Sequence, residues 1–277
     1  MWIYEALYNN IKLGLEGNLL YKTKTPFQDL KIYDTPALGR VLLLDNIVQT
    51  TEKDEFIYHE MMTHPVLLAH PKPEKVLIIG AGDGGILREV LKYPSVKEAY
   101  LIEIDEAVIT VSKKYLPTLH KGAFENKRAK VIIADGAKFI KETKERFDVV
   151  IVDSSDPIGP ATVLFTRNFY VSIRSILKED GLLIRQTGST LFQPREVKDN
   201  YKLMAKVFPR LAIQVAAIPT YIGGFFSFII ASKKIDPAKV SCSKISAKYN
   251  KLKLNTKYYN PEIHFASLKL PNYLKKG

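Results

Sequence analysis

The stretch VLIIGAGDGG, residues 76–85, decides the fold class. An apolar run ends at Gly80, and Gly82 and Gly85 complete the spacing G-x-G-x-x-G before a helical pattern begins. Glycines at such positions allow a tight turn and a close approach of the backbone to a ligand, and the helix start offers unpaired N–H groups. The stretch predicts a strand, a ligand-binding turn and a helix, although a tight turn without a ligand stays the alternative for this motif alone.

Strand and helix patterns alternate on both sides of this turn. Strand-like apolar runs occupy residues 76–80, 99–104, 130–134, 148–153 and 181–186, with two more near 214–218 and 226–232. Helix-like patterns occupy residues 84–91, 106–115, 137–142, 166–177 and 195–208. Continuous apolar strands separated by helices predict a mostly parallel sheet covered on both faces. We predict an α/β fold with a Rossmann-like, methyltransferase-like domain over residues 54–277.

The first 53 residues predict a small N-terminal antiparallel β domain. Strand-like runs lie at residues 19–24, 28–33, 39–44 and 47–51, with Asp45 and Asn46 as a hairpin turn. Such a unit is too small to be stable alone, so it packs against the larger domain or a second copy. A helix follows over residues 54–70, with Asp54 as a candidate N-cap and Pro65 as a break or kink.

Composition bounds the class of protein. A chain of 277 residues with 46% hydrophobic residues can bury a full core. No stretch approaches the roughly 20 apolar residues of a membrane span, so we expect no membrane partner. Residues 1–18 include Glu5 and Glu16 and lack a long apolar run, which argues against a signal peptide. The single cysteine, Cys242, fits a reducing, cytoplasmic location.

The net charge of +12 raises the question of a nucleic-acid partner. Lysines are scattered along the last forty residues among Ser, Asn and Tyr, without an arginine cluster or a nucleic-acid-binding motif. Net charge alone speaks to solubility and non-specific binding. We therefore expect a solvated, lysine-rich surface and no nucleic-acid partner.

Acidic residues follow the predicted strands where a nucleoside would bind. Glu103 ends the strand after the glycine turn, where a carboxylate can accept both hydroxyls of a ribose. The adjacent Asp105 is expected to cap the next helix. This pattern fits a nicotinamide dinucleotide or an S-adenosylmethionine-type nucleoside. Asp135 and Gly136 follow the third strand, where nucleoside-binding methyltransferase-like folds place an acidic residue against the adenine amino group. This similarity favours the second ligand, with a plain turn as the alternative.

Asp83 discriminates between ligands of the nucleoside class. A carboxylate at a helix N-terminus suits the helix dipole, which is the simpler interpretation. It would also repel the carboxylate of ordinary S-adenosylmethionine. A ligand without that carboxylate and with a free ammonium would be attracted, and decarboxylated S-adenosylmethionine is such a ligand.

The segment VDSSDPIGP places Asp153 at the end of the fourth strand and Asp156 three residues later. Ligands bind at the carboxyl edge of open α/β sheets, so this pair favours a cation-binding pocket over turns and caps alone. His59, Glu60 and His64 invite a zinc interpretation. The two histidines stand at i and i+5, about 140° apart on a helix, so we expect no metal site and a structural role for His64.

Several motifs in order resemble the spermidine synthases, most closely the bacterial members. They are TPFQDL, GRVLLLDNIVQTTEKDEFIYHEMMTH, IGAGDGG, EID, ADG, DSSDPIGPATVLF and IPTYIGG. The resemblance implies that Asp153 is the base for the attacking amine and that Asp83 binds the donor's ammonium. It implies donor contacts from Gln28, Gly80, Gly82, Glu103, Asp135, Gly136 and Pro160. It implies a polyamine site made by Tyr58, His59, Asp83, Asp153, Ser154, Ser155, Asp156, Gln186 and Tyr221, with residues 154–163 as a gate.

Two positions depart from the resembled pattern. Ala81 stands where many members have glycine, which is expected to be harmless, and Gly188 stands where many have a glutamate that could anchor an amine. The implied reaction moves an aminopropyl group from decarboxylated S-adenosylmethionine, a co-substrate, to putrescine, giving spermidine and 5'-methylthioadenosine. The sulfonium donor is already activated, so no metal or redox cofactor is expected. The resemblance implies a homodimer, with a homotetramer also possible.

Four alternatives stay open at this point. One keeps the chemistry but uses another acceptor, such as spermidine, cadaverine or agmatine. A second is an S-adenosylmethionine-dependent methyltransferase, which Asp83 and the acidic loop disfavour. A third is an NAD-dependent dehydrogenase. The last is a nucleic-acid-binding protein that keeps the fold without catalysis, against which Asp83, Asp153 and Asp156 argue.

Overall fold

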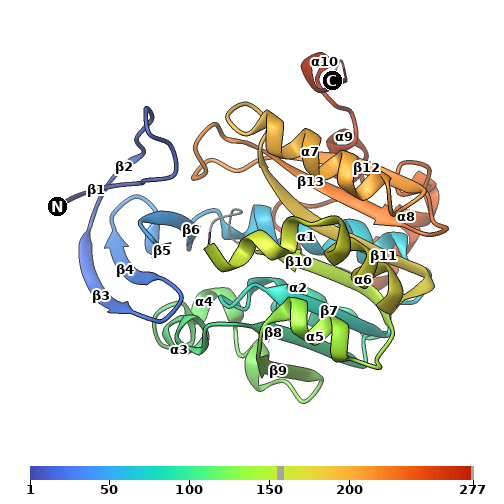
Figure 1. Cartoon of the computed structure of the whole chain (residues 1–277), viewed down its shortest axis with the longest axis horizontal. Coiled ribbons are helices and arrows are strands. Elements are labelled where there is room, and N and C mark those ends of the chain that lie inside the picture. Colours follow the sequence, from blue (N-terminus) through green and yellow to red (C-terminus); the bar gives the residue numbers. More distant parts are fainter. Residues whose placement is uncertain (155–158, 276–277) are drawn as a thin grey trace.

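The structure is a computed structural model that describes residues 1–154 and 159–275. Its N-terminal strands form a curved β unit at one end of the molecule, beside a larger sheet with helices (Figure 1). The N-terminal strands are β1 (Trp2–Tyr4), β2 (Gly14–Glu16), β3 (Asn18–Lys24), β4 (Asp29–Thr35), β5 (Gly39–Leu44) and β6 (Ile47–Thr51). β3 to β6 form one antiparallel sheet in chain order, as predicted, and the short pair β1–β2 was not predicted.

The hairpin turn between β5 and β6 is confirmed. Asp45 and Asn46 have φ angles of 50° and 62°, the left-handed region that a tight two-residue hairpin turn requires at both positions. The predicted division between residues 53 and 54 falls in the connection from β6 to the next helix.

Seven strands form the larger sheet, in the order β12-β13-β11-β10-β7-β8-β9. They are β7 (Lys75–Gly80), β8 (Glu98–Glu103), β9 (Ala129–Ile133), β10 (Phe147–Asp153), β11 (Leu177–Ser189), β12 (Arg210–Ala217) and β13 (Phe225–Ser232). β7 to β11 run parallel to one another. β13 runs antiparallel to both of its neighbours, β11 and β12. The predicted mostly parallel, Rossmann-like sheet is confirmed.

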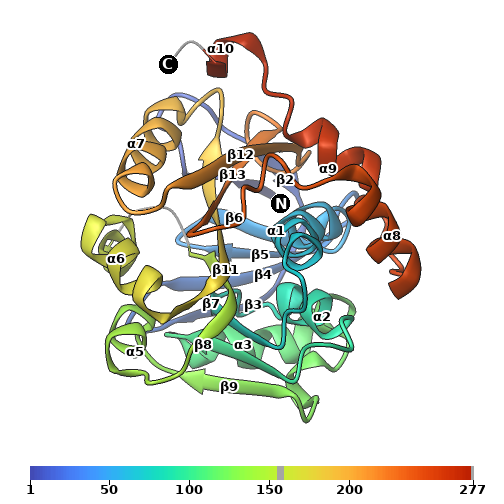
Figure 2. The ribbon, with the colours of Figure 1, turned by 90° about the vertical axis from the view of Figure 1, so that its right-hand side faces the viewer.

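Helices cover both faces of this sheet, with α5, α6 and α7 on one side and α1, α2 and α8 on the other (Figure 2). The helices are α1 (Glu55–Ala69), α2 (Gly85–Leu91), α3 (Glu106–Tyr115), α4 (Pro117–His120), α5 (Gly136–Glu142), α6 (Arg167–Ile176), α7 (Pro194–Ala205), α8 (Cys242–Leu252), α9 (Pro261–Ser267) and α10 (Asn272–Lys275). Two 3-10 helices, η1 (Ala123–Glu125) and η2 (Gly159–Phe165), complete the elements.

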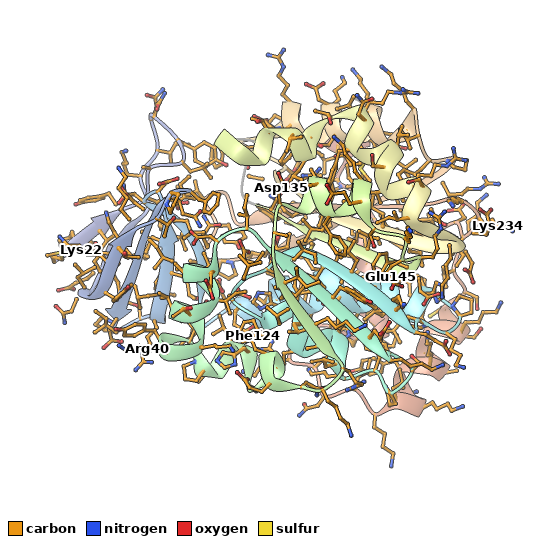
Figure 3. All side chains as sticks on the ribbon, turned by 60° about the horizontal axis from the view of Figure 1, so that its bottom comes forward. Lys22, Arg40, Phe124, Asp135, Glu145 and Lys234 are labelled. Atoms are coloured by element: carbon orange, nitrogen blue, oxygen red, sulfur yellow. The ribbon has the colours of Figure 1, made fainter. Side chains whose placement is uncertain are left out.

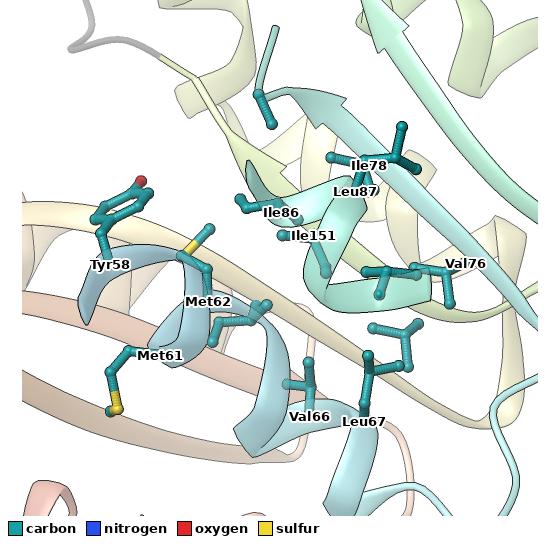
Figure 4. Packing of buried hydrophobic residues seen from close by; sticks show 14 of the residues in the cluster. Tyr58, Met61, Met62, Val66, Leu67, Val76, Ile78, Ile86, Leu87 and Ile151 are labelled. Carbon is teal, nitrogen blue, oxygen red and sulfur yellow. The ribbon is translucent and has the colours of Figure 1, made fainter. Parts of the chain in front are cut away.

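Alternate residues of the central strands bury their side chains in two separate cores. Val76 and Ile78 of β7 face α1 and α2, whereas Leu77 and Ile79 face the opposite helices. Figure 4 shows the first core, in which Met61, Met62, Val66 and Leu67 of α1 pack toward the sheet. Each fully buried side chain of this kind stabilises the fold by about 1.5–3 kcal/mol. The two cores hold the carboxyl ends of β7, β8 and β10 at one edge.

Of the two expectations for α1, the break at Pro65 is wrong, whereas Asp54 does occupy the predicted N-cap position. The helix continues through Pro65 to Ala69, because buried side chains on both sides of the proline offset its cost of about 3 kcal/mol. Asp54 stands before the helix but its side chain caps nothing there. It accepts instead from the Thr51 hydroxyl at 2.7 Å and from the Thr220 N–H at 2.9 Å, and so ties the start of α1 to a distant loop.

The C-terminal segment, whose helices were not predicted, anchors α1. Lys248 of α8 donates to the carbonyl oxygens of Leu67 at 2.7 Å and His70 at 2.5 Å, which supplies donors to the helix end. Glu60 accepts from three successive backbone N–H groups of residues 257–259, each at 2.8 Å. The last forty residues therefore position the helix from which two predicted site residues come.

Basic side chains extend from both ends of the molecule (Figure 3). Lys22 lies on the N-terminal sheet and Lys234 at the far end, with Asp135 between them. Within residues 1–154 and 159–275, no helix is long and apolar enough to cross a membrane.

Replacing Lys248 by methionine should lower the free energy of unfolding by about 1–3 kcal/mol, because two charge-assisted hydrogen bonds to the end of α1 are lost. Urea denaturation of both proteins measures the difference. The control is Lys251→Met, an exposed residue of the same helix, which should leave stability nearly unchanged. Equal stability of the two variants would contradict this role for Lys248.

Candidate active site

A pocket of about 330 Å³ lies where the carboxyl edge of the larger sheet meets the N-terminal β unit. Most of the predicted site residues line it, although they come from distant parts of the chain. They are Gln28, Tyr58, His59, Gly80, Gly82, Asp83, Glu103, Asp135, Gly136, Asp153, Ser154, Gln186 and Tyr221. Ser155 and Asp156, and with them part of the predicted gate, lie outside the described residues. Pro160 lies in η2, and Val163 and Leu164 of that helix reach the pocket.

The charge of the lining is the opposite of the charge of the whole chain. Six carboxylates reach the pocket, from Glu5, Asp45, Asp83, Glu103, Asp135 and Asp153. None of the described lining residues is a lysine or an arginine, and His59 is the lining histidine. The pocket is therefore built to attract a cation.

Asp153 lies at the end of β10 and contacts Tyr58 of α1. The Tyr58 hydroxyl donates to Asp153 Oδ1 at 2.5 Å. Burial and the nearby Asp83 raise the pKa of Asp153 to about 6, against the opposing effects of Tyr58 and His59. Burial and Asp153 together raise the pKa of Tyr58 well above its usual value, so Tyr58 stays a hydrogen-bond donor. Asp153 is thus an oriented carboxylate able to accept a proton near neutral pH.

A chain of alternating charges supports Asp83. His59 Nε2 lies 3.1 Å from Asp83 Oδ2, and His59 Nδ1 lies 2.6 Å from Glu55 Oε2. Arg88 completes the chain at 2.9 Å from Glu55. Burial favours the neutral imidazole, but Asp83 and Glu55 outweigh it and raise the pKa of His59 to about 10. Burial acts to raise the pKa of Asp83, but the protonated His59 outweighs it, so that this pKa is lowered.

The side of the pocket near β8 joins the N-terminal unit to the larger sheet. Gln28 donates to Asp105 Oδ2 at 2.9 Å, and the same carboxylate caps α3, as predicted. Glu103 accepts from the Asp105 N–H at 2.9 Å, and burial raises the pKa of Glu103 to about 7. A buried carboxyl group of this kind is suited to bind hydroxyl groups. Asp135 caps α5, which agrees with the simpler interpretation and leaves its ligand contact a prediction.

Comparisons with known proteins decide the family. Residues 55–243 match the family model of the spermine/spermidine synthase domain, and residues 1–52 match that of the spermidine synthase tetramerisation domain. The chain belongs to the spermine/spermidine synthase family. It is therefore a transferase of the aminopropyltransferase class, and the resemblance found in the sequence is confirmed.

Members of this family from bacteria match nearly the whole chain. A polyamine aminopropyltransferase of Thermoanaerobacter sp. (strain X514) is 47% identical, covering 99% of this chain and 97% of its own length. One from Desulforudis audaxviator is 49% identical, covering 99% and 98%. A crystal structure of a spermidine synthase with the transition-state analogue AdoDATO has a TM-score of 0.95 at 42% identity, covering 100% of this chain and 94% of that one. The spermidine synthase from Thermotoga maritima has a TM-score of 0.94 at 42% identity, covering 100% and 93%.

The structure gives a physical account of the two departures from this family's sequence pattern. Ala81 has a φ of 60°, the left-handed region in which a Cβ atom costs about 1–2 kcal/mol. Alanine in place of glycine at this position is therefore strained, and the expectation that it is harmless was too simple. Gly188 has a φ of 90°, and a Cβ there would lie 2.5 Å from Gln193 Oε1. The Gln193 side chain accepts from the Ser189 N–H at 2.9 Å. Glycine is thus required at residue 188 in this member of the family.

The residues that suggested zinc have structural partners. His64 Nδ1 lies 2.9 Å from the Tyr93 hydroxyl and Nε2 lies 3.0 Å from Glu89, while Glu60 binds backbone N–H groups as described above. The predicted structural role of His64 is confirmed.

A second cluster, His70, Asp148 and Asp180, brings potential metal ligands together. The Lys72 N–H donates to His70 Nδ1, so the neutral ring carries its proton on Nε2, which faces the two carboxylates at 3.7 and 3.6 Å. A metal would need the lone pair on Nε2, which this tautomer does not offer.

Sequence reasoning missed several residues of the pocket. Glu5, Tyr8, Gln193 and Phe226 line it without belonging to any quoted motif, and Gln49 lies in a quoted motif but was given no role in the site. They carry no local signal, because tertiary packing alone brings residues 5 to 49 against residues 189 to 226.

Replacing Glu55 by glutamine should lower the free energy of unfolding by about 3 kcal/mol at pH 7, because it breaks a buried charged network. The raised pKa of His59 contributes stability that is fully present below pH 6.5 and is lost as pH rises through about 10. The difference in the free energy of unfolding between wild type and variant should therefore become smaller above pH 10. Chemical denaturation at several pH values measures it, with exposed Glu142→Gln as the control. A gap that does not change with pH would contradict this charge assignment.

Proposed function

We propose that the enzyme transfers the aminopropyl group of decarboxylated S-adenosylmethionine to putrescine, giving spermidine and 5'-methylthioadenosine. The observation that carries this proposal is the pocket lined by carboxylates, with Asp153 oriented by Tyr58 at 2.5 Å. Both substrates are cations, and a pocket of this charge favours them over anionic ligands. The relative that crystallised with the transition-state analogue AdoDATO has the same fold, which supports the choice of donor class.

Each end of the donor has a matching group in the proposed complex. Glu103 would accept the ribose hydroxyls, with Gln28, Asp135 and Gly136 around the nucleoside. Asp83 would bind the ammonium of the aminopropyl group. Ordinary S-adenosylmethionine would bring its carboxylate toward Asp83, and like charges in a buried site repel. This charge argument, with the family assignment, favours aminopropyl transfer over methyl transfer and over hydride transfer from a nicotinamide.

In the proposed step, a neutral amine nitrogen attacks the aminopropyl carbon bound to the sulfonium. The new C–N bond forms as the C–S bond breaks, and sulfur keeps the electron pair to become a neutral thioether. The nitrogen gives up one proton, which Asp153 accepts. A free alkylamine resembles lysine, with a pKa of about 10.4, so a nearby base helps the amine to attack. The sulfonium is an activated leaving group, so the proposed step calls for no metal or redox cofactor.

The identity of the acceptor amine is the part of the proposal for which other compounds compete with putrescine. Tyr58, His59, Ser154, Gln186 and Tyr221 line the pocket and are proposed to form its acceptor side, with Ser155 and Asp156 outside the described residues. Their side chains would suit any alkyl amine, so spermidine, cadaverine and agmatine are the competing acceptors. Putrescine is proposed because the IPTYIGG segment resembles that of putrescine-using members of the family.

Assembly and location also belong to the proposal. Met1, Trp2 and Tyr4 are 71%, 62% and 58% exposed, and such apolar surface suits contact with a second copy. Together with the family model for residues 1–52, this supports a homodimer or homotetramer. The free, exposed Cys242 fits work in the reducing cytoplasm. The lysine-rich surface is proposed to be solvated and to bind no nucleic acid.

Assay of the wild type with decarboxylated S-adenosylmethionine and putrescine should give equal amounts of methylthioadenosine and spermidine. Asp153→Asn should lose about 10²–10⁴-fold in kcat, since it cannot accept the proton. Asp199→Asn, an exposed residue of α7, is the matched control and should keep full activity. Turnover with another amine but not with putrescine would keep the proposed reaction and show that the acceptor is a different amine. Methyl transfer from ordinary S-adenosylmethionine, without aminopropyl transfer, would refute the proposal.

The pH profile tests Asp153 separately. Its raised pKa means that the carboxylate is ionised, and active, above about pH 6 and protonated below it. The value of kcat/KM for the donor should therefore fall below about pH 6, since this quantity reports the free enzyme. A profile flat from pH 5 to 8 would contradict Asp153 as the proton acceptor.

A further inference from the structure

Arg185 is an arginine whose side chain lies in the core of the larger domain. The residue is 0% exposed and is among the largest fully buried side chains. It belongs to β11, opposite Val152 of β10 and Ile229 of β13. An arginine keeps its charge inside a protein, and burying a charge is costly unless hydrogen bonds satisfy it. Its place in the core therefore depends on the partners of its guanidinium.

These partners belong to the end of η2, to α6 and to β11 itself. Nη1 donates to Leu164 O at 2.8 Å and to the Tyr170 hydroxyl at 2.6 Å, and Nε donates to Gln186 O at 3.1 Å. The guanidinium carbon lies 3.9 Å from the centroid of the Phe165 ring, a cation–π contact. In the part of the chain that the structure describes, Nη2 has no hydrogen-bond partner. Arg185 thus binds the backbone and a ring at the end of η2.

Two helices hold the guanidinium in place. The Tyr170 hydroxyl, which accepts from Arg185, donates to Asn200 Oδ1 at 2.7 Å. Asn200 Nδ2 in turn donates to Glu196 O at 2.9 Å, within α7. Tyr170 and Asn200 are both buried, and α6 and α7 lie on the same side of the sheet (Figure 2). The strand and the two helices therefore fix the guanidinium, and the guanidinium fixes the end of η2.

The end of η2 is part of the pocket wall. Leu164 lines the pocket and packs against the core on the α5, α6 and α7 side of the sheet. Ile79 and Ile102 belong to that core and also line the pocket. Each of these isoleucines directly precedes a residue that is proposed to contact the donor. Leu164 is therefore on the side of the pocket proposed for the nucleoside.

The residue after Arg185 binds a second point of the pocket wall. Gln186 Nε2 donates to Ser154 O at 2.8 Å, and both of these residues line the pocket. Successive side chains of a strand point to opposite faces of the sheet. Strand β11 therefore binds the backbone of Leu164 from one face and that of Ser154 from the other.

We infer that Arg185 is a positioning residue, which holds Leu164 and Phe165 in place and so sets how tightly the pocket binds the nucleoside of the donor. The inference rests on the proposed aminopropyl transfer. Arg185 is not among the lining residues, so it acts through η2 and leaves the proton transfer to Asp153. A wall that is already fixed loses little conformational freedom when a ligand binds, which strengthens binding.

Arg185→Met tests this role, because methionine is apolar, flexible and without a donor. The variant should raise the Kd of 5'-methylthioadenosine, measured by isothermal titration calorimetry, and the KM of the donor about tenfold each. Its kcat should stay within about twofold of the wild-type value, because the lost interaction is made equally in the ground state and the transition state. Arg174→Met is the same change at an exposed position of α6 and should bind as the wild type does.

Stability separates a positioning role from a merely structural one. An apolar side chain in place of a buried charge is often neutral or stabilising. Arg185→Met should therefore match or exceed the wild type in urea denaturation while it binds methylthioadenosine more weakly.

A double variant tests the route through η2. Phe165→Leu removes the ring that the guanidinium contacts and keeps an apolar side chain. Adding Arg185→Met to it should weaken methylthioadenosine binding by less than the product of the two single effects, because both changes release the same contact. Effects that multiply would show that Arg185 acts by another route and would overturn the inference.

Three further results would overturn it. Arg185→Met could bind methylthioadenosine as tightly as the wild type does. It could lose stability together with binding, which would indicate a structural role. It could lower kcat without changing the KM of the donor. In each of these cases the proposed transfer stands if the wild type carries it out. A wild type that neither binds methylthioadenosine nor transfers the aminopropyl group would remove the proposed function, and this inference with it.

Discussion

Six acidic residues line one pocket, of which Asp45 and Asp135 are exposed, and the described part of its lining contains neither lysine nor arginine to neutralise them. Like charges held together in this way resist ionisation, and the pKa of Asp153 is raised to about 6 for this reason as well as by burial. His59 is the protonated side chain that offsets the charge of Asp83. In the proposed complex a sulfonium and an ammonium would relieve this repulsion, so the same constraint would supply affinity and select the ligand. The basic outer surface lies farther away and is screened by salt.

Three parts of the fold bring the pocket side chains together: the strand ends of the larger sheet, helix α1 and the N-terminal unit. Parallel strands β7, β8 and β10 end at one edge and deliver Asp83, Glu103 and Asp153. Helix α1 crosses beneath them with Tyr58 and His59, and the C-terminal segment anchors it through Lys248 and Glu60. The N-terminal unit closes the remaining side with Gln28 and Glu5. Each side chain of the pocket therefore depends on packing elsewhere in the chain.

The sequence predicted what periodicity and end-of-strand position can show. Apolar runs such as residues 76–80 gave the parallel sheet, and the carboxylates that follow them gave part of the lining of the pocket. Tertiary packing decided the rest: α1 continues through Pro65, and Asp54 bonds to Thr220 instead of capping its helix. Glu5 follows a three-residue strand, too short for a period to be visible, so nothing local marks it as a pocket residue.

The central claim is that this pocket prefers a cationic donor without a carboxylate. Isothermal titration calorimetry with decarboxylated and ordinary S-adenosylmethionine tests it directly, on the wild type and on Asp83→Asn. The account predicts that the wild type binds the decarboxylated compound at least about tenfold more tightly, and that the variant loses most of this difference. Equal affinity of the wild type for both compounds, or tighter binding of the ordinary one, would contradict it.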